Sequence, residues 1–446
     1  MKVRNVRGCD SKRYAAICLL AAVAGGMVLP RLVQAGKPQS WRDQVVVWQG
    51  KSLFHHSWVA NDPLSHGDGV GPVFNERSCV ACHGNGGSGG SGPASKNVDL
   101  LSASKVGGNR ANPSREKLSE LHQGFRLTDS VVLHKFGLEP EYDAWRLSVL
   151  KKMSGTDSSG FASVPGFSVR RSQRNTPPLF GLGLIDAIPA SVIEKAASTP
   201  HPEYAQAKGR VSRNPDGSIN RFGWKAQLPT LESFVLTACA GELGLESPGH
   251  PQAKSGLVPD TRPHELDLTE PQCSALVQYV SALPRPRMIP PSGGRMKASV
   301  AVGQDLFTSI GCASCHSPRL GDVDGIYSDL LLHDMGQSLS DSGAYYSVEE
   351  PKGQLAKSDE WRTPPLWGLR DSAPYLHDGR ARTIAQAIAQ HDGQGLYSAK
   401  WFHELTVAEK RDLVNFLMTL AAPRSFSRGL TVPDIELSSN AGKGSR

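Results

Sequence analysis

Two copies of the pattern C-x-x-C-H constrain this chain more than any other feature. They run from Cys79 to His83 and from Cys312 to His316. Two thiols three residues apart on a helical turn can both reach the vinyl groups of one haem, and the next histidine can bind its iron. A zinc or thiol redox motif is the alternative, but two copies that both end in histidine argue against it. We therefore expect two covalently bound haem c groups, with attachment cysteines Cys79, Cys82, Cys312 and Cys315 and iron ligands His83 and His316.

The first 35 residues have the order of a secretory signal peptide. Five basic residues precede an apolar run from Tyr14 to Pro30, and Val33 to Ala35 offers small residues for cleavage. We expect cleavage after Ala35, with an uncleaved membrane anchor as the alternative. No later stretch is apolar and long enough to span a bilayer. The sequence therefore predicts a periplasmic protein without stable membrane insertion.

Most of the positive net charge of the chain lies in this predicted signal peptide. Residues 1–35 carry six basic residues and one acidic residue, so their removal lowers the formal net charge from +7 to +2. No cluster of lysine and arginine is interleaved with aromatic residues. The sequence therefore does not favour a nucleic-acid partner.

Two cysteines of the mature chain, Cys239 and Cys273, lie outside the haem motifs. In an oxidising compartment we expect a structural disulfide between them. Two buried free thiols are the alternative.

An internal repeat indicates two domains. The segment Thr176–Leu182 recurs as Thr363–Leu369 with only its aromatic residue changed, and the pattern of Leu268–Leu283 recurs in Leu405–Leu420. Each half thus has a haem motif, a T-P-P-L loop and a closing helix in the same order. The mature chain of about 410 residues also exceeds what one hydrophobic core usually serves.

Each closing segment has the apolar spacing of a helix that must bury one stripe, with Thr269 and Thr406 as helix caps. Its partner is the helix that precedes each haem motif, such as Val302–Phe307. We expect a mainly α fold of two cytochrome c-like helical domains with long loops, the first enlarged by insertions. One insertion is the Gly/Ser-rich loop Gly84–Gly92, flexible or wrapped at the haem edge. The expected parts are a signal peptide (1–35), an N-terminal haem domain (36–286), a linker (287–294), a C-terminal haem domain (295–426) and a tail (427–446).

Several segments resemble the bacterial di-haem oxidoreductases. Besides both C-x-x-C-H motifs, they are Asn75–Cys79, Arg174–Pro189, Gly223–Gln227 and Ala373–Gly379. That group is similar to the di-haem cytochrome c peroxidases and to the di-haem enzyme that matures methylamine dehydrogenase, and its members are often labelled thiol oxidoreductases. The resemblance covers most of the mature chain and indicates a family rather than a substrate.

For the second haem, the resemblance implies a distal ligand shortly after the A-P-Y-x-H-D-G segment, where the peroxidases carry methionine. The matching residue here is His391, so we expect ligation by His316 and His391. Met335 is the competing ligand, and a core or loop role for His391 is the third alternative. His377 matches a family position that contacts a haem propionate.

For the first haem, the sequence identifies only His83 as a ligand. Four other histidines, His55, His56, His122 and His134, could supply a sixth ligand, but for each of them a surface or helix-capping role is favoured.

The resemblance also implies catalytic groups. Peroxide cleavage needs a side chain that moves a proton between the two oxygens, and Glu194 lies near the place of a peroxidase glutamate. An exposed helical glutamate is the alternative. An aromatic ring could relay electrons between the haems, with Trp224 as the first candidate and Trp145 as the second, although a core role is common for either. The peroxidases use calcium near the domain interface, so calcium is implied, but the sequence has no acidic D-x-D-x-D-G loop.

These features predict an exported di-haem c oxidoreductase that reduces peroxide or uses it to oxidise a small-molecule or protein substrate. Its electron donor would be a cytochrome or another redox protein. A non-catalytic electron-transfer cytochrome with two six-coordinate haems is one alternative. A haem-dependent dioxygenase is another.

Overall fold

The computed structural model describes residues 40–106, 115–154, 161–257, 265–341 and 355–423. The predicted signal peptide (1–35) and the whole predicted tail (427–446) lie outside these residues. The described residues belong to one compact unit. The boundary between the two haem domains stays a prediction. No described helix combines the length and apolar character needed to cross a membrane.

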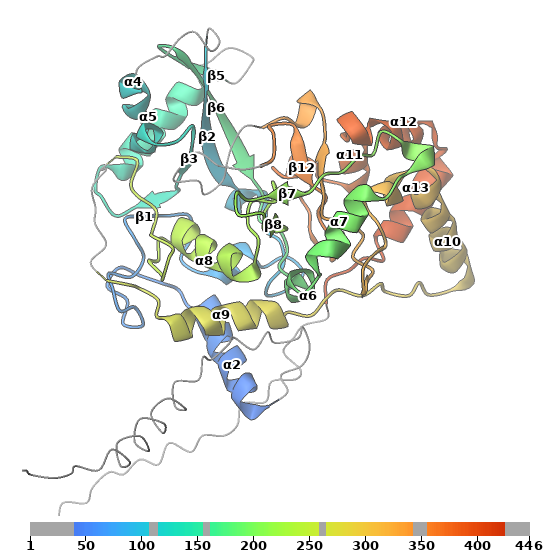
Figure 1. Cartoon of the computed structure of the whole chain (residues 1–446), viewed down its shortest axis with the longest axis horizontal. Helices are drawn as coiled ribbons and strands as arrows, with labels where there is room; N and C mark the ends of the chain where they lie inside the picture. The colour runs from blue at the N-terminus through green and yellow to red at the C-terminus, as the bar shows by residue number, and fades with distance from the viewer. Residues whose placement is uncertain (1–39, 107–114, 155–160, 258–264, 342–354, 424–446) are drawn as a thin grey trace, which may run out of the picture. The chain divides into compact units, whose positions relative to one another are not determined.

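The fold is mainly α, as the sequence predicts (Figure 1). The α-helices are α2 (Trp41–His55), α3 (Cys79–Cys82), α4 (Glu116–Ser119), α5 (Tyr142–Ser154), α6 (Leu182–Asp186), α7 (Ala190–Ser198), α8 (Leu231–Glu242), α9 (Glu270–Ala282), α10 (Gly294–Ser309), α11 (Ile384–Ala389), α12 (Leu396–Glu404) and α13 (Val407–Leu417). The strands are β1 (Val73–Phe74), β2 (Val98–Lys105), β3 (Ser130–Leu133), β4 (Phe136–Gly137), β5 (Phe161–Val164), β6 (Phe167–Arg174), β7 (Ser212–Arg213), β8 (Ile219–Asn220), β9 (Arg319–Leu320), β10 (Val323–Asp324), β11 (Leu332–Asp334) and β12 (Glu360–Arg362).

The two closing helices are α9 and α13, and each begins at its predicted threonine cap. Thr269 forms a reciprocal capping box with Gln272, and Thr406 forms one with Glu409. Each box satisfies two backbone groups that would otherwise lack partners at a helix start. Helix α9 packs on α2, and α13 packs on α10. The predicted partnership with the helix before each haem motif is therefore confirmed.

A glycine lets each of these helix pairs approach closely. A Cβ atom at Gly50 of α2 would collide with the carbonyl oxygen of Ala275 in α9. A Cβ atom at Gly303 of α10 would collide in the same way with the carbonyl oxygen of Asp412 in α13. Only glycine leaves room for this backbone contact. The two halves therefore repeat one helix crossing, a detail that the sequence comparison missed.

The two T-P-P-L loops lie against each other. Gly181 and Gly368 follow them in left-handed conformations, with φ of 72° and 70°. The ring of Trp367 occupies the space where a Cβ of Gly181 would lie, and the ring of Phe180 lies beside Gly368. The one residue that differs between the repeats is thus an aromatic residue that packs across the junction of the two halves.

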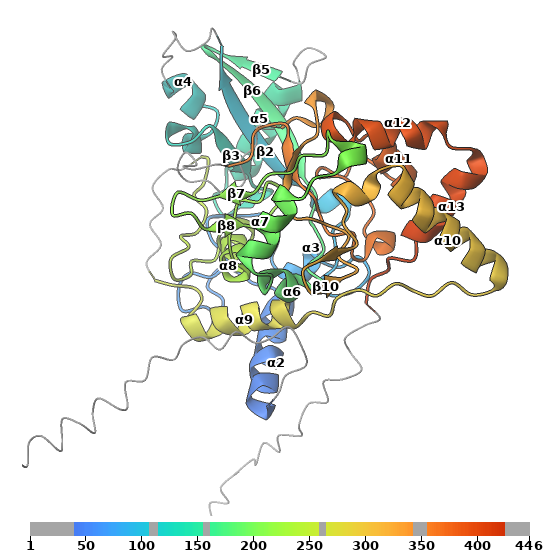
Figure 2. The ribbon, with the colours of Figure 1, turned by 45° about the vertical axis from the view of Figure 1, so that its right-hand side comes forward.

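An inserted β-sheet enlarges the first half. Four antiparallel strands in the order β3-β2-β6-β5 lie between the first haem motif and its T-P-P-L loop, and Figure 2 shows α5 beside this sheet. The insertion has its own core, which includes Leu101, Leu118, Phe125 and Val169. The sequence predicted insertions in this half but not these strands.

The Gly/Ser-rich loop Gly84–Gly92 wraps around the first haem motif. The amide of Gly89 donates to the carbonyl of His83, and the amide of Leu179 donates to the carbonyl of Gly89. The loop thereby connects the haem motif to the T-P-P-L loop of the same half.

The helix crossing at Gly303 predicts a stability effect. Gly303→Ala forces α10 and α13 apart, which should lower the free energy of unfolding of the holoprotein by about 1–3 kcal/mol. The matched control is Gly294→Ala in the same helix, where a Cβ meets no atom within 4 Å; it should change stability by less than about 0.5 kcal/mol. Urea denaturation followed by circular dichroism measures both. Equal stability of the two variants would contradict the close backbone contact between α10 and α13 at Gly303.

Candidate haem-binding sites

Each C-x-x-C-H motif lines a mostly apolar cavity. Cys79, Cys82 and His83 line a first cavity of about 130 Å³. The motif from Cys312 to His316 lines a second cavity of about 240 Å³. Apolar walls around paired sulfur atoms and an imidazole suit a porphyrin.

The attachment sulfurs lie in surroundings that disfavour charge. Burial raises the pKa of Cys79, Cys82 and Cys312 to about 12. An uncharged thioether therefore fits these positions better than a thiolate does.

Two imidazoles, those of His316 and His391, lie close together in the second cavity. Nδ1 of His316 donates to the carbonyl of Tyr327 at 3.0 Å, and Nδ1 of His391 donates to the carbonyl of Ala387 at 2.8 Å. A carbonyl can only accept, so in both rings Nε2 is left without a proton and can bind a metal. The two ring centroids are 6.5 Å apart. Both residues line one cavity, so His316 and His391 could both hold the iron of a haem bound there.

Burial also keeps these rings neutral. It lowers the pKa of His316 to about 4 and lowers that of His391 below its usual value. A neutral imidazole is the form that binds metal. The pairing of His316 with His391 as iron ligands is consistent with these observations and stays a prediction.

Met335 lines the same second cavity. Its Cε and the Cβ of His391 both lie beside Gly395, so the two candidate ligands are neighbours. The short distance between the His316 and His391 rings favours His391, and Met335 remains the alternative ligand.

The first cavity presents a different set of residues. Nδ1 of His83 donates to the carbonyl of Gly90 at 3.0 Å, and burial lowers the pKa of His83 to about 4. Among the described residues that line this cavity, no second histidine and no methionine occurs. The side chains therefore offer a single imidazole here, whereas the second cavity offers two.

The four histidines considered as a sixth ligand lie outside the first cavity. His55 contacts Ser88, and His56 pairs with Asp62. The side chains of His122 and His134 are buried: His122 accepts from the amide of Gly124 at the start of a short 3-10 helix, and His134 donates to the carbonyl of Gly241. All four have structural partners in these positions.

The expected disulfide between Cys239 and Cys273 is not formed. Both residues are buried free thiols in the first hydrophobic core, and Cys239 also lines the first cavity. Burial raises the pKa of both thiols. The apolar packing therefore holds them as uncharged thiols, which are poor metal ligands.

Trp224 belongs to the wall between the cavities. It lines both of them, together with Asn175, Thr176 and Pro177. Its Nε1 donates to the carbonyl of Asn175 at 2.8 Å, which fixes the ring. Trp145, the second relay candidate, packs in the core of the inserted sheet and lines neither cavity.

Glu194 lines neither of the two cavities. Its side chain is 47% exposed and forms an ion pair with Arg213. Two other carboxylates, Glu76 and Glu242, line the first cavity. Sequence reasoning missed both. Glu76 lies three residues before Cys79, so its closeness to the haem motif could have been predicted from the sequence. The position of Glu242 depends on how α8 packs.

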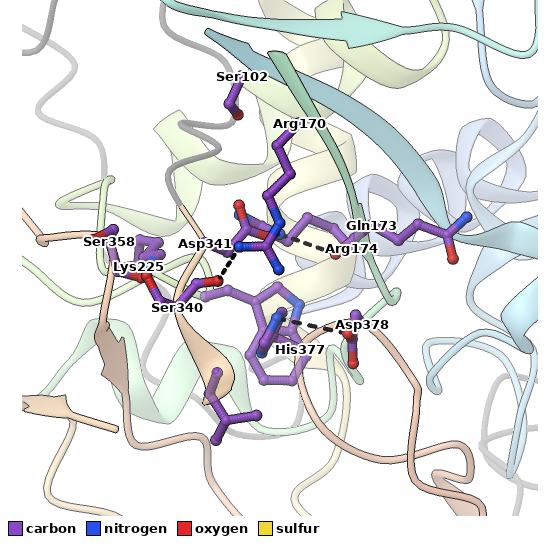
Figure 3. A network of polar contacts seen from close by, with 12 residues as sticks. Ser102, Arg170, Gln173, Arg174, Lys225, Ser340, Asp341, Ser358, His377 and Asp378 are labelled. Atoms are coloured by element: carbon purple, nitrogen blue, oxygen red, sulfur yellow. Dashed lines mark hydrogen bonds and ion pairs between the residues drawn. The ribbon is translucent and has the colours of Figure 1, made fainter. Parts of the chain in front are cut away.

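A stack of rings and cations lies beside the second cavity, and Figure 3 labels three of its members, Arg174, Lys225 and His377. His377 lines that cavity, and its ring stacks on Trp361 with centroids 3.7 Å apart. The ammonium of Lys225 lies 3.7 Å from the centroid of Trp361, so it must contact the opposite face of the indole. Arg174 also lies over Trp361 and pairs with Asp341. The stack holds the His377 ring in place.

Buried cations near the cavities suit an anionic partner. Arg362 lines the second cavity, and burial lowers its pKa to about 10. Burial also lowers the pKa of Lys225 to about 7. Arg174 lines the first cavity. Arg174 already pairs with Asp341, and the ammonium of Lys225 donates to three backbone carbonyls. A haem propionate would therefore join groups that already have partners. The predicted propionate role of His377 is consistent with this setting and stays a prediction.

Calcium also stays a prediction. In the described parts of the chain, one group of side chains has spacing suited to a metal ion, namely Cys315, Asp329 and His333. Its sulfur belongs to the second haem motif, and the group lacks the oxygen-rich character that calcium prefers.

The chain belongs to the di-haem oxidoreductase family. Residues 128–420 match the family described as "Di-haem oxidoreductase, putative peroxidase". The family implies two haems, which agrees with the two cavities.

Two curated relatives match parts of the chain. The methylamine utilization protein MauG of Methylorubrum extorquens is 32% identical over 150 residues, which are 30% of this chain and 39% of that protein. Cytochrome-c peroxidase IdrP2 of Denitromonas iodatirespirans is 25% identical over 190 residues, which are 36% of this chain and 51% of that protein. The matches thus span about half or less of these relatives.

A solved structure of a MauG-like protein associated with microbial copper homeostasis also aligns, at 17% identity and a TM-score of 0.27. It covers 53% of this chain and 90% of that one. At this score the likeness carries no argument.

The neighbouring imidazoles predict a spin-state change. His391→Ala removes one of two strong ligands, so the second haem should change from low-spin to high-spin, as magnetic circular dichroism of the oxidised holoprotein would show. Met335→Leu is the matched variant from the same cavity and should leave the spectrum as in the wild type. The reverse pattern would identify Met335 as the ligand.

Proposed function

We propose that this chain is an exported, periplasmic di-haem c peroxidase-like oxidoreductase in which the first cavity is the peroxide site. The observation that supports this assignment is the asymmetry of the cavities. His316 and His391 both line the second, whereas His83 is the only histidine in the described lining of the first. Haem supplies an iron that can bind peroxide where one position is open and that mainly passes electrons where two strong ligands hold it.

Glu242 is the proposed proton carrier in place of Glu194. Its Oε2 accepts from Nδ2 of Asn75 at 2.8 Å, so the carboxylate is held at the cavity wall. A carboxylate there can take the proton from one peroxide oxygen and deliver it to the other. Glu76 lines the same cavity and pairs with Lys96. It is the second candidate for the proton carrier.

Trp224 keeps its proposed role as a relay. Its indole touches both cavities and is held by Asn175. Reduction of one hydrogen peroxide to two waters consumes two electrons and two protons. The electrons would come from a donor cytochrome or another redox protein. If a protein or small-molecule substrate supplies them instead, the same chemistry oxidises that substrate.

Electron transfer without catalysis is the second candidate, and the His316/His391 pair favours it for the second haem only. A response of the holoprotein to hydrogen peroxide separates the two functions. No feature of the described residues favours the dioxygenase alternative.

The position of Glu242 predicts a kinetic defect. Glu242→Gln keeps the shape of the side chain but removes its proton transfer, which should slow the reaction with hydrogen peroxide by about 10²–10⁴-fold in stopped-flow absorbance. Glu232→Gln is the matched control, because Glu232 is exposed on the same helix and does not line the cavity. A third variant, Glu194→Gln, tests the earlier assignment. A defect in Glu194→Gln with normal kinetics in Glu242→Gln would overturn the proposal.

A further inference from the structure

Three aromatic rings form a continuous chain from the second cavity to the surface. The centroids of Tyr204 and Tyr397 are 5.8 Å apart, and those of Tyr397 and Trp401 are 6.0 Å apart. Both pairs meet edge to face, which is a favourable aromatic geometry. Tyr204 ends a short 3-10 helix, Pro202–Tyr204, while Tyr397 and Trp401 lie one turn apart on α12. This row of aromatic rings thus joins the two halves of the protein.

The inner end of this chain is at the second haem motif. Tyr204 lines the second cavity, and its hydroxyl donates to the carbonyl of Ser309 at 2.6 Å. A Cβ at Gly311 would lie 2.7 Å from the ring of Tyr204, so the ring packs directly on the backbone before Cys312. Gly311 has a φ of 90°, which glycine adopts without strain.

The phenol at this end keeps its proton. Burial raises the pKa of Tyr204, and its hydroxyl faces a carbonyl, which cannot act as a base at neutral pH. Tyr204 therefore serves as a bridge between the haem motif and the outer rings, and the exposed indole of Trp401 is the group that gives up an electron.

The outer end of the chain is open to solvent. Tyr397 is 41% exposed and Trp401 is 47% exposed, and Leu396 beside them is 39% exposed. The described surface has another tryptophan with the same exposure, Trp48, at 47%. No ring contact within the described residues ties Trp48 to either cavity. Trp401 and Trp48 are therefore equally exposed, but only Trp401 is linked to the second cavity by ring contacts among the described residues.

We propose that Trp401, Tyr397 and Tyr204 carry electrons inward from an external one-electron donor to the second haem site. This inference rests on the proposed function and adds the place where the donor acts. In each transfer the indole of Trp401 gives one electron inward and keeps its N–H proton as a cation radical. A reduced cytochrome at the surface then returns one electron to the indole and is itself oxidised by one electron. Two such transfers, with two protons, reduce one hydrogen peroxide to two waters.

A flash-quench experiment on the holoprotein tests this route without peroxide. Lys400→Cys places a thiol next to Trp401 for attachment of a ruthenium tris(bipyridine) label, since the native free thiols Cys239 and Cys273 are buried. After the haems are reduced with dithionite and excess reductant is removed, a flash and quencher generate ruthenium(III). This ion withdraws an electron, and haem absorbance gives the rate of oxidation.

In this labelled background, Trp401→Phe should lower the rate by at least about tenfold. Tyr397→Leu, which interrupts the ring chain while leaving Trp401, should lower it as well. Trp48→Phe is the matched control and should keep the unmodified rate. Equal rates in Trp401→Phe and Trp48→Phe would overturn the inference.

This measurement separates two failures. If the rates differ as expected but the holoprotein does not respond to hydrogen peroxide, the peroxidase proposal fails and the electron route stands. If peroxide reacts but the rates are equal, the peroxidase proposal stands and the route fails.

Discussion

The hydrogen bond between a proposed ligand histidine and a backbone carbonyl is the interaction on which the candidate sites depend. It occurs three times: His83 donates to Gly90, His316 to Tyr327 and His391 to Ala387. In each case the carbonyl fixes the tautomer, so that Nε2 carries the lone pair that iron needs. Burial disfavours protonation of all three rings. The backbone thus sets both the direction and the charge state of the proposed ligands.

The repeated helix crossing holds these carbonyls and cavities in place. Gly50 and Gly303 let the paired helices touch backbone to backbone, and the T-P-P-L loops of the two halves pack on each other through Trp367 and Phe180. Because Trp224 lines both cavities at this junction, the contact between the halves also brings the two sites close. Similar scaffolds thus surround sites with different side chains, one with a single imidazole and one with two.

Local patterns in the sequence predicted much of this arrangement. The starts of α9 and α13 could be predicted at Thr269 and Thr406, because a capping box involves only residues within one four-residue segment. His391 needed the family resemblance, because nothing local distinguishes a ligand histidine. Glu242 and Cys239 could not be placed at the first cavity, since their positions depend on how α8 packs against distant segments. The strands of the insertion were missed although Phe167 and Val169 alternate with exposed or half-buried residues, a period-two signal that was available.

The proposed roles of the two cavities require two chemically different irons. Low-temperature electron paramagnetic resonance of the fully oxidised holoprotein measures this difference most directly. The asymmetry of the cavities predicts one high-spin and one low-spin signal in equal amounts, with the high-spin signal changing when hydrogen peroxide is added. Two low-spin signals that do not respond to peroxide would contradict the account and would identify the protein as an electron-transfer cytochrome.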